Sequence, residues 1–132
     1  MARKLPALNP DNIAFWQGGE TGSLNIHHCS GCRRYFHPPA PICPHCLSQN
    51  VAPRPVSGRG KVISYTINHQ RWQATLEVPY VVAIVELKEQ TGLRLVSNIV
   101  GMPADEVRID LPVKVTFSQI EDVWLPFFEK EA

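Results

Sequence analysis

The sequence has no hydrophobic run that approaches the ~18 residues a helix needs to cross a bilayer, although 44% of its 132 residues are hydrophobic. The first ten residues, MARKLPALNP, contain Arg3 and Lys4 but no apolar segment behind them, so they do not resemble a secretory signal. With 19% charged residues, the composition is typical of one compact domain or two small ones. These absences predict a soluble, cytoplasmic protein with no membrane partner.

Acidic residues are missing from a long central stretch. Between Thr21 and Leu76 there is no Asp or Glu, whereas ten of the twelve acidic residues lie from Glu77 onward. This positive stretch could meet an anionic ligand or an acidic partner, or it could be ordinary scatter between two small domains. The formal net charge of +1 does not favour a nucleic-acid-binding protein. The stretch contains all five histidines and six basic residues: Arg33, Arg34, Arg54, Arg59, Lys61 and Arg71.

Cysteine is scarce but concentrated. All four cysteines fall within 18 residues as two Cys-x-x-Cys pairs, with ten residues between the pairs. Two such turns can direct four sulfurs at one ion in a tetrahedron with metal–sulfur distances of about 2.3 Å. Gly31 and Pro44 lie inside the pairs and are typical turn residues. The spacing predicts a metal site, and its ligands are Cys29, Cys32, Cys43 and Cys46.

Other roles of cysteine compete with this interpretation. Two disulfides are disfavoured in a cytosolic chain, and a redox Cys-x-x-Cys motif would begin a helix. A catalytic zinc keeps one position open for water, whereas a four-cysteine site is closed, so the metal is expected to be structural zinc. Iron in a rubredoxin-like site would use the same ligands and stays open as an alternative. Surface or outer positions around the metal are expected for the nearby histidines, which are His27, His28, His37 and His45.

The N-terminal part, residues 1–22, is predicted to form an extended arm and a short helix over 11–18. Asp11 favours the start of this helix, and the glycine pair that begins at Gly18 favours its end. A helix this short is marginal in isolation, so its apolar patch is expected to pack on its own domain or on another chain. The patch consists of Ile13, Phe15 and Trp16.

The remainder divides into a zinc ribbon over residues 23–52 and a barrel over residues 53–132, which begins with a linker and turns over 53–60. Tyr80–Leu87 is almost entirely apolar and is expected to be buried on both faces. Five or six short strands without a long helix predict a small β-barrel of the oligonucleotide/oligosaccharide-binding (OB) type. The expected strands are Lys61–Gln70, Tyr80–Leu87, Leu93–Val100, Val107–Leu111, Val113–Ile120 and Val123–Phe127, with Arg71–Pro79 as a loop.

The chain resembles a known family, the zinc-ribbon and OB-fold proteins grouped as DUF35. The resemblance runs nearly end to end, and its specificity lies in the order of the motifs, since no single one is diagnostic. The motifs are Phe15-Trp16 followed by Gly22-Ser23-Leu24, the cysteine pairs with Pro38, Pro39 and Pro41 between them, Ser57–Val62 leading to Ser64-Tyr65-Thr66, Pro79–Leu87, Pro112–Val115 with Phe117, and Leu125–Phe128.

The resemblance implies a mainly β protein with a short helix, a rubredoxin-like ribbon and an OB barrel. It also implies a non-catalytic partner of a thiolase-superfamily enzyme, such as a thiolase, an acyltransferase or an aldolase that acts on CoA thioesters. Hydroxymethylglutaryl-CoA-synthase-like proteins and hydratase subunits are further partners in the family. In such complexes the ribbon and helix dock on the partner, and the barrel lies beside the route to the active site, with a link to acyl-CoA handling.

The residues themselves agree with an accessory role. A thiolase needs a nucleophilic cysteine, and here all four cysteines are assigned to metal. The basic first half could contact the phosphates of a CoA thioester. The alternative is a nucleic-acid-binding module, for which the candidate stacking and basic residues are Tyr65, Arg71, Trp72 and Tyr80. A stand-alone enzyme is disfavoured because no catalytic constellation is visible.

Overall fold

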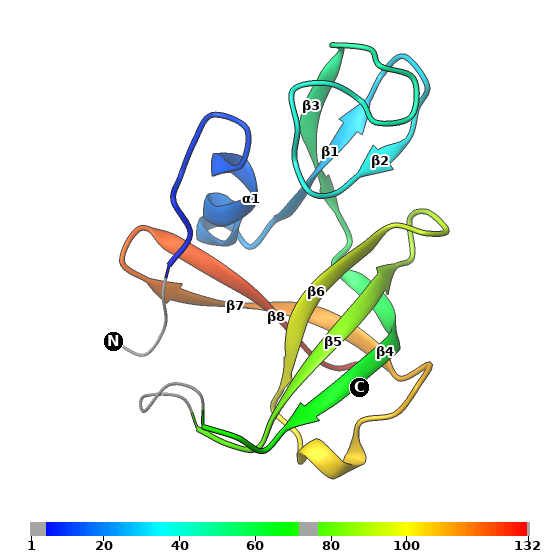
Figure 1. Cartoon of the computed structure of the whole chain (residues 1–132). Coiled ribbons are helices and arrows are strands. Elements are labelled where there is room, and N and C mark those ends of the chain that lie inside the picture. Colours follow the sequence, from blue (N-terminus) through cyan, green and yellow to red (C-terminus); the bar gives the residue numbers. More distant parts are fainter. Residues whose placement is uncertain (1–4, 72–76, 132) are drawn as a thin grey trace.

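The computed structural model describes residues 5–71 and 77–131. It contains a three-stranded ribbon sheet, a closed five-stranded barrel and one short helix beside them (Figure 1). This architecture confirms the predicted fold class. No helix in the described residues is long and apolar enough to cross a membrane. The elements are α1 (Ile13–Gln17), η1 (Gly18–Thr21), β1 (Leu24–Cys29), β2 (Tyr35–Phe36), β3 (Val51–Val56), β4 (Arg59–Asn68), β5 (Tyr80–Leu87), β6 (Arg94–Val100), η2 (Ala104–Glu106), β7 (Pro112–Ile120) and β8 (Val123–Lys130).

The start of α1 differs from the prediction. Asn9, rather than Asp11, organises it: the Asn9 side-chain oxygen accepts the backbone N–H groups of Asp11 and Asn12, each at 2.9 Å. Asn12 returns the bond by accepting the N–H of Asn9 at 2.9 Å. The α-helix ends before Gly18, as predicted, and a 3₁₀ turn continues to Thr21. An asparagine side chain that accepts from residues two and three positions on is an Asx turn, which a search for a capping residue next to the helix does not detect.

The ribbon sheet has the strand order β2-β1-β3, with all pairs antiparallel. Its third strand falls where a linker of turns was predicted over 53–60, and that prediction is wrong. The misleading residues are Pro53 and Pro55, which oppose His27 and Asn25 of β1. Proline cannot donate to a neighbouring strand, but it is tolerated in an edge strand, and β3 lies at the edge of this sheet.

The barrel closes in the order β4-β5-β6-β8-β7. Burial alternates along β5, so the prediction that it is buried on both faces is wrong: one face enters the core and the other is half-buried. The predicted strand Val107–Leu111 is also absent, and its backbone forms turns instead. Val107 and Leu111 are nevertheless buried, and Leu111 is bonded at its carbonyl to the N–H of Val62 at 3.1 Å. The apolar pattern therefore predicted the buried residues correctly, but the strand that it also predicted does not form.

One hydrophobic core joins the barrel, β1 and α1. Leu24 and Ile26 of β1 are 1% and 0% exposed and belong to the same cluster as Phe15, Val62 and Phe128. Phe15 and Trp16 of the N-terminal apolar patch therefore pack on their own domain, one of the two expected outcomes, whereas Ile13 is 41% exposed. A second, smaller cluster inside the ribbon is centred on Cys29, Phe36 and Cys43. Because β1 contributes to both clusters, it connects the ribbon rigidly to the barrel.

The hairpin between β5 and β6 provides a second connection to the ribbon. The Gln90 side chain accepts the backbone N–H of Tyr35 at 2.8 Å and donates to the Tyr35 carbonyl at 2.9 Å. Beside it, the Glu89 carboxylate accepts the N–H of Ser57 at 2.7 Å. The ribbon is thus held to the barrel by backbone-directed hydrogen bonds as well as by the shared core.

Candidate metal centre and adjoining cleft

The two Cys-x-x-Cys turns have the same local geometry. After each pair, one residue adopts a left-handed conformation: Arg33 at φ 61° and Leu47 at φ 64°. Each of these residues donates its backbone N–H to the carbonyl of the first cysteine of its pair, Arg33 to Cys29 at 2.8 Å and Leu47 to Cys43 at 2.9 Å. Gly31, predicted as a turn residue, has an ordinary φ, so the unusual conformation falls on non-glycine residues that the sequence did not mark. Two matching turns present two pairs of sulfurs to one point.

The four sulfurs converge. Their Sγ atoms all lie within 4.8 Å of one another, with Cys29 to Cys46 at 3.6 Å and Cys32 to Cys43 at 3.7 Å. Corners of a tetrahedron around a metal with 2.3 Å bonds are about 3.8 Å apart, whereas disulfide sulfurs are about 2.05 Å apart. All four cysteines are free. The donor set and its spacing fit a four-thiolate metal site.

Electrostatics explain why such a cluster needs a cation. The backbone N–H of Cys32 is the largest influence that lowers the pKa of Cys29, to about 7. Desolvation is the largest influence that raises the pKa of Cys32, to about 12. A backbone N–H from His45 also donates to the sulfur of Cys43 at 3.3 Å. Amides favour some thiolates, but four adjacent thiolates require a bound metal ion, because like charges at this distance repel strongly.

The nearby histidines point elsewhere. Among the described residues, the one group of three or more potential ligands consists of the four cysteines. His27 is 6% exposed and contacts the Phe36 ring edge-on, with ring centroids 5.6 Å apart. His45 is exposed and lies 3.3 Å from the guanidinium of Arg34. These positions agree with the expectation that the histidines lie outside the ligand set.

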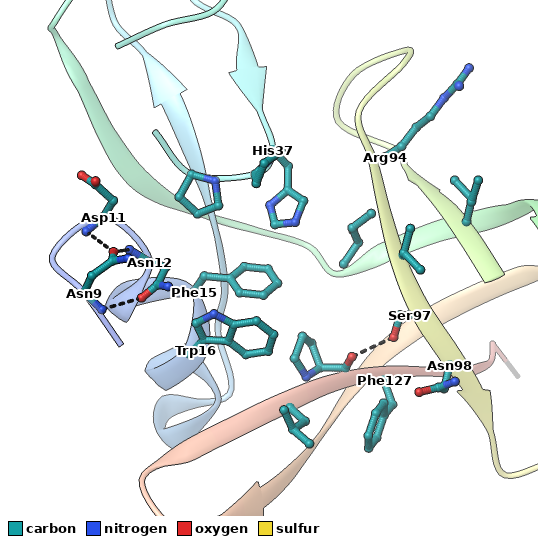
Figure 2. A pocket seen from close by; sticks show the side chains of 17 residues that line it. Asn9, Asp11, Asn12, Phe15, Trp16, His37, Arg94, Ser97, Asn98 and Phe127 are labelled. Atoms are coloured by element: carbon teal, nitrogen blue, oxygen red, sulfur yellow. Dashed lines mark hydrogen bonds between the residues drawn. The ribbon is translucent and has the colours of Figure 1, made fainter. Parts of the chain in front are cut away.

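A cleft of about 700 Å³ opens beside the ribbon, between α1, the segment after β2, and strands β5, β6 and β8 (Figure 2). Phe15, Trp16 and His37 line one wall, and residues 94–98 of β6 line the opposite wall. The cleft was not predicted, because it exists only where five segments that are separate in the sequence meet. No local pattern in the sequence signals it.

Among the side chains that line the cleft, His37 has the largest shift in pKa. Its ring lies 4.8 Å from that of Phe15, measured between centroids, and its Nδ1 atom is buried without a hydrogen-bond partner. Desolvation by burial lowers the pKa of His37 to about 4, and the nearby His27 contributes in the same direction. His37 is therefore neutral at physiological pH and acts as part of an apolar wall.

Among the residues considered for nucleic-acid stacking, the three that the structure describes do not form a shared exposed face. Tyr65 is half-buried and packs against the barrel core. Tyr80 is half-buried opposite Asn68 at the start of β5. Arg71 is exposed, and Trp72 lies outside the described residues. The arrangement gives no support to an aromatic platform of the kind that single-stranded nucleic acids need.

Two family models match adjoining parts of the chain. Residues 16–52 match the family model "ChsH2, rubredoxin-like zinc ribbon domain", and residues 53–118 match "ChsH2, C-terminal OB-fold domain". A solved structure of the "Ltp2-ChsH2(DUF35) aldolase" contains a chain that is 38% identical, with a TM-score of 0.84. The match covers 96% of this chain and 98% of that one. The chain belongs to the DUF35 family.

Several curated relatives of this DUF35 chain are named as subunits of CoA-thioester enzymes. A "Probable enoyl-CoA hydratase alpha subunit" of Thermomonospora curvata is 39% identical over 96% of this chain. A "Benzoylsuccinyl-CoA thiolase subunit BbsA" of Thauera aromatica is 28% identical over 87% of this chain and 77% of its own length. The chain spans about two fifths of the length of the first curated relatives it matches.

Proposed function

We propose that this DUF35 chain is a non-catalytic accessory subunit that docks on a thiolase-superfamily enzyme, such as a thiolase, an acyltransferase or an aldolase, and supports the conversion of a CoA thioester. The observation that carries the proposal is the match of almost the whole chain, in sequence and fold, to a chain of the Ltp2-ChsH2(DUF35) aldolase. Thiolase-type chemistry needs a cysteine nucleophile, and the convergence of all four cysteines on one point leaves no thiol for it.

Within this proposal, Cys29, Cys32, Cys43 and Cys46 bind a structural zinc ion. A zinc ion there supplies no chemistry to a substrate, because four thiolates close its coordination; it stabilises the two turns of the ribbon. Convergent free thiols also support a cytoplasmic location, where thiols stay reduced. Direct contact of this chain with the CoA thioester, and a further hydroxymethylglutaryl-CoA-synthase-like or hydratase subunit, are the finer parts of the proposal.

The test is recovery of the partner from the native host. The tagged chain is expected to co-purify with a thiolase-superfamily protein at comparable stoichiometry, identified by mass spectrometry. An empty-tag sample treated in the same way is the control. Recovery of nucleic acid alone, or of no partner, would contradict the accessory role and leave the family membership as a statement about fold.

A further inference from the structure

The barrel closes through a short pairing between β6 and β8, and beside this pairing the two strands leave a gap, which we call the seam. β6 pairs with β5 from Arg94 through Ile99, but its pairing with β8 is limited to Ile99 and Val100. In the described part of the chain, the side of β6 that faces away from β5 therefore has no strand partner between Arg94 and Ser97. The cleft lies along this edge (Figure 2), because residues 94–98, which alternate between the two faces of the strand, all line it.

The opposite strand is a poor partner for an incoming chain. At the seam, β8 contributes Pro126, which has no N–H to donate. The Pro126 carbonyl already accepts the Ser97 hydroxyl at 2.8 Å. The donors and acceptors that stay open at this seam are therefore those of alternate β6 residues, Arg94 and Val96, because Leu95 and Ser97 face β5.

The two edge strands of the ribbon sheet are protected, in contrast to the β6 edge. Edge strands carry unpaired backbone groups and are normally blocked or covered. The edge strand β3 is blocked by Pro53 and Pro55, and the edge strand β2 is covered by Gln90, which occupies both the N–H and the carbonyl of Tyr35. On β6, by contrast, Val96 is 67% exposed and lines the same cleft as aromatic and proline side chains.

The charge at this edge identifies the kind of segment it fits. Arg94 begins β6 at the rim of the cleft and is exposed. Glu86 lies opposite it on β5, but the Glu86 carboxylate accepts the Gly92 N–H at 3.0 Å. Among residues 5–71 and 77–131, no carboxylate lies within ion-pair distance of Arg94. An acidic residue of a bound segment would complement this cation.

From these observations we propose that the cleft receives an extended segment of the thiolase-type partner, which adds as a strand to the Arg94–Ser97 edge of β6 and places an acidic residue beside Arg94. Backbone groups at strand spacing recognise a polypeptide rather than an acyl chain, while the apolar wall accepts alternate side chains. The inference rests on the accessory role proposed above and adds the docking surface and the conformation of the docked segment.

The test compares two exposed aliphatic residues in complexes formed with the purified partner. Val96→Glu places a charge inside the cleft and is expected to weaken binding at least tenfold. Ile109→Glu makes the same change at a residue that is 52% exposed and lies outside the cleft, and it is expected to leave binding unchanged. Equal effects of the two variants, or no effect of either, would overturn the inference.

Hydrogen exchange on the wild-type complex provides a second measurement that needs no variant. The backbone amides of Arg94 and Val96 are expected to gain protection when the partner binds. Alternate residues of an antiparallel strand point to its free side, and the bond from the Leu87 N–H to the Leu93 carbonyl puts Arg94 and Val96 there, whereas Leu95 and Ser97 face β5. A complex that forms without this protection would overturn the strand-addition inference while leaving the accessory role intact. Protection caused by a CoA thioester alone, or by self-association of this chain, would replace the proposed occupant. Failure to form any complex would overturn both proposals.

Discussion

At the scale of single residues, His37 gives the structure a dependence on pH that can be measured. The folded chain holds His37 neutral down to about pH 4, whereas an unfolded histidine accepts a proton near pH 6.5. Protonation therefore favours the unfolded chain. The stability associated with neutral His37 is fully present above pH 6.5 and is lost as the pH falls toward 4, by at most about 3 kcal/mol.

The corresponding prediction uses His37→Phe, which keeps an aromatic ring against Phe15 but cannot titrate. Between pH 7 and pH 4, the free energy of unfolding of the wild-type chain should fall by up to about 3 kcal/mol more than that of the variant. Urea unfolding at both pH values measures the difference, and acid effects on the cysteine cluster occur in both proteins and cancel. Parallel curves for the two proteins would show that His37 is not held neutral.

Residue patterns predicted the cysteine cluster well and the cleft not at all. Cys-x-x-Cys spacing specifies a local turn, so four positions in the sequence already determine how the sulfurs converge. The left-handed Arg33 and Leu47 were missed because this conformation is uncommon for such residues and nothing in their identity signals it. His37 was read as an outer residue of the ribbon, since its contact with Phe15 depends on tertiary packing.

At the scale of secondary-structure elements, the Gln90 contact determines how the ribbon is fastened to the barrel. Gln90→Ala removes both hydrogen bonds to Tyr35 and opens the β2 edge. The expected cost is about 1–3 kcal/mol of unfolding free energy, with faster hydrogen exchange at Tyr35. Gln119→Ala is the matched control, because its one bond, to the Glu121 carbonyl, is exposed, and it should change stability little. A loss of equal size in both variants would contradict a specific fastening role.

Strand prediction succeeded where apolar segments were bounded by turn residues, as in the β5–β6 hairpin. It failed where one signal was read alone. In β3, proline was interpreted as a linker, although an edge strand tolerates it. In residues 107–111, buried Val107 and Leu111 were interpreted as a strand, although their backbone turns and bonds to Val62. Which edge a strand occupies, and which loop covers a core, depend on long-range packing.

At the scale of the whole molecule, the two cores predict two responses to loss of the metal. Chelation, or Cys43→Ser, should release the metal and unfold the small core around Cys29 and Phe36. The barrel should stay folded, because Leu24 and Ile26 are anchored in its own core. Hydrogen exchange should therefore show lost protection over residues 29–48 and retained protection at Leu24 and Ile26.

The same experiment also measures the metal content of each variant and its binding to the partner. Both should be lost together in Cys43→Ser, while Ser30→Ala, a change at an exposed position inside the first turn, should preserve both. If Cys43→Ser kept its metal and its partner, the assignment of the ribbon as a metal-dependent docking element would be wrong. If the barrel unfolded as well, the two cores would form a single cooperative unit.

The contact between α1 and the β7–β8 hairpin also sets the order in which the chain can fold during synthesis. The Gln17 side chain donates to the Asp122 carbonyl at 3.1 Å, across 105 residues of sequence. α1 leaves the ribosome early, but its docking surface emerges only with β8. α1 therefore lacks its contacts with β8 until almost the entire barrel has been translated. This interval is when the nascent chain is most open to aggregation and to capture by chaperones.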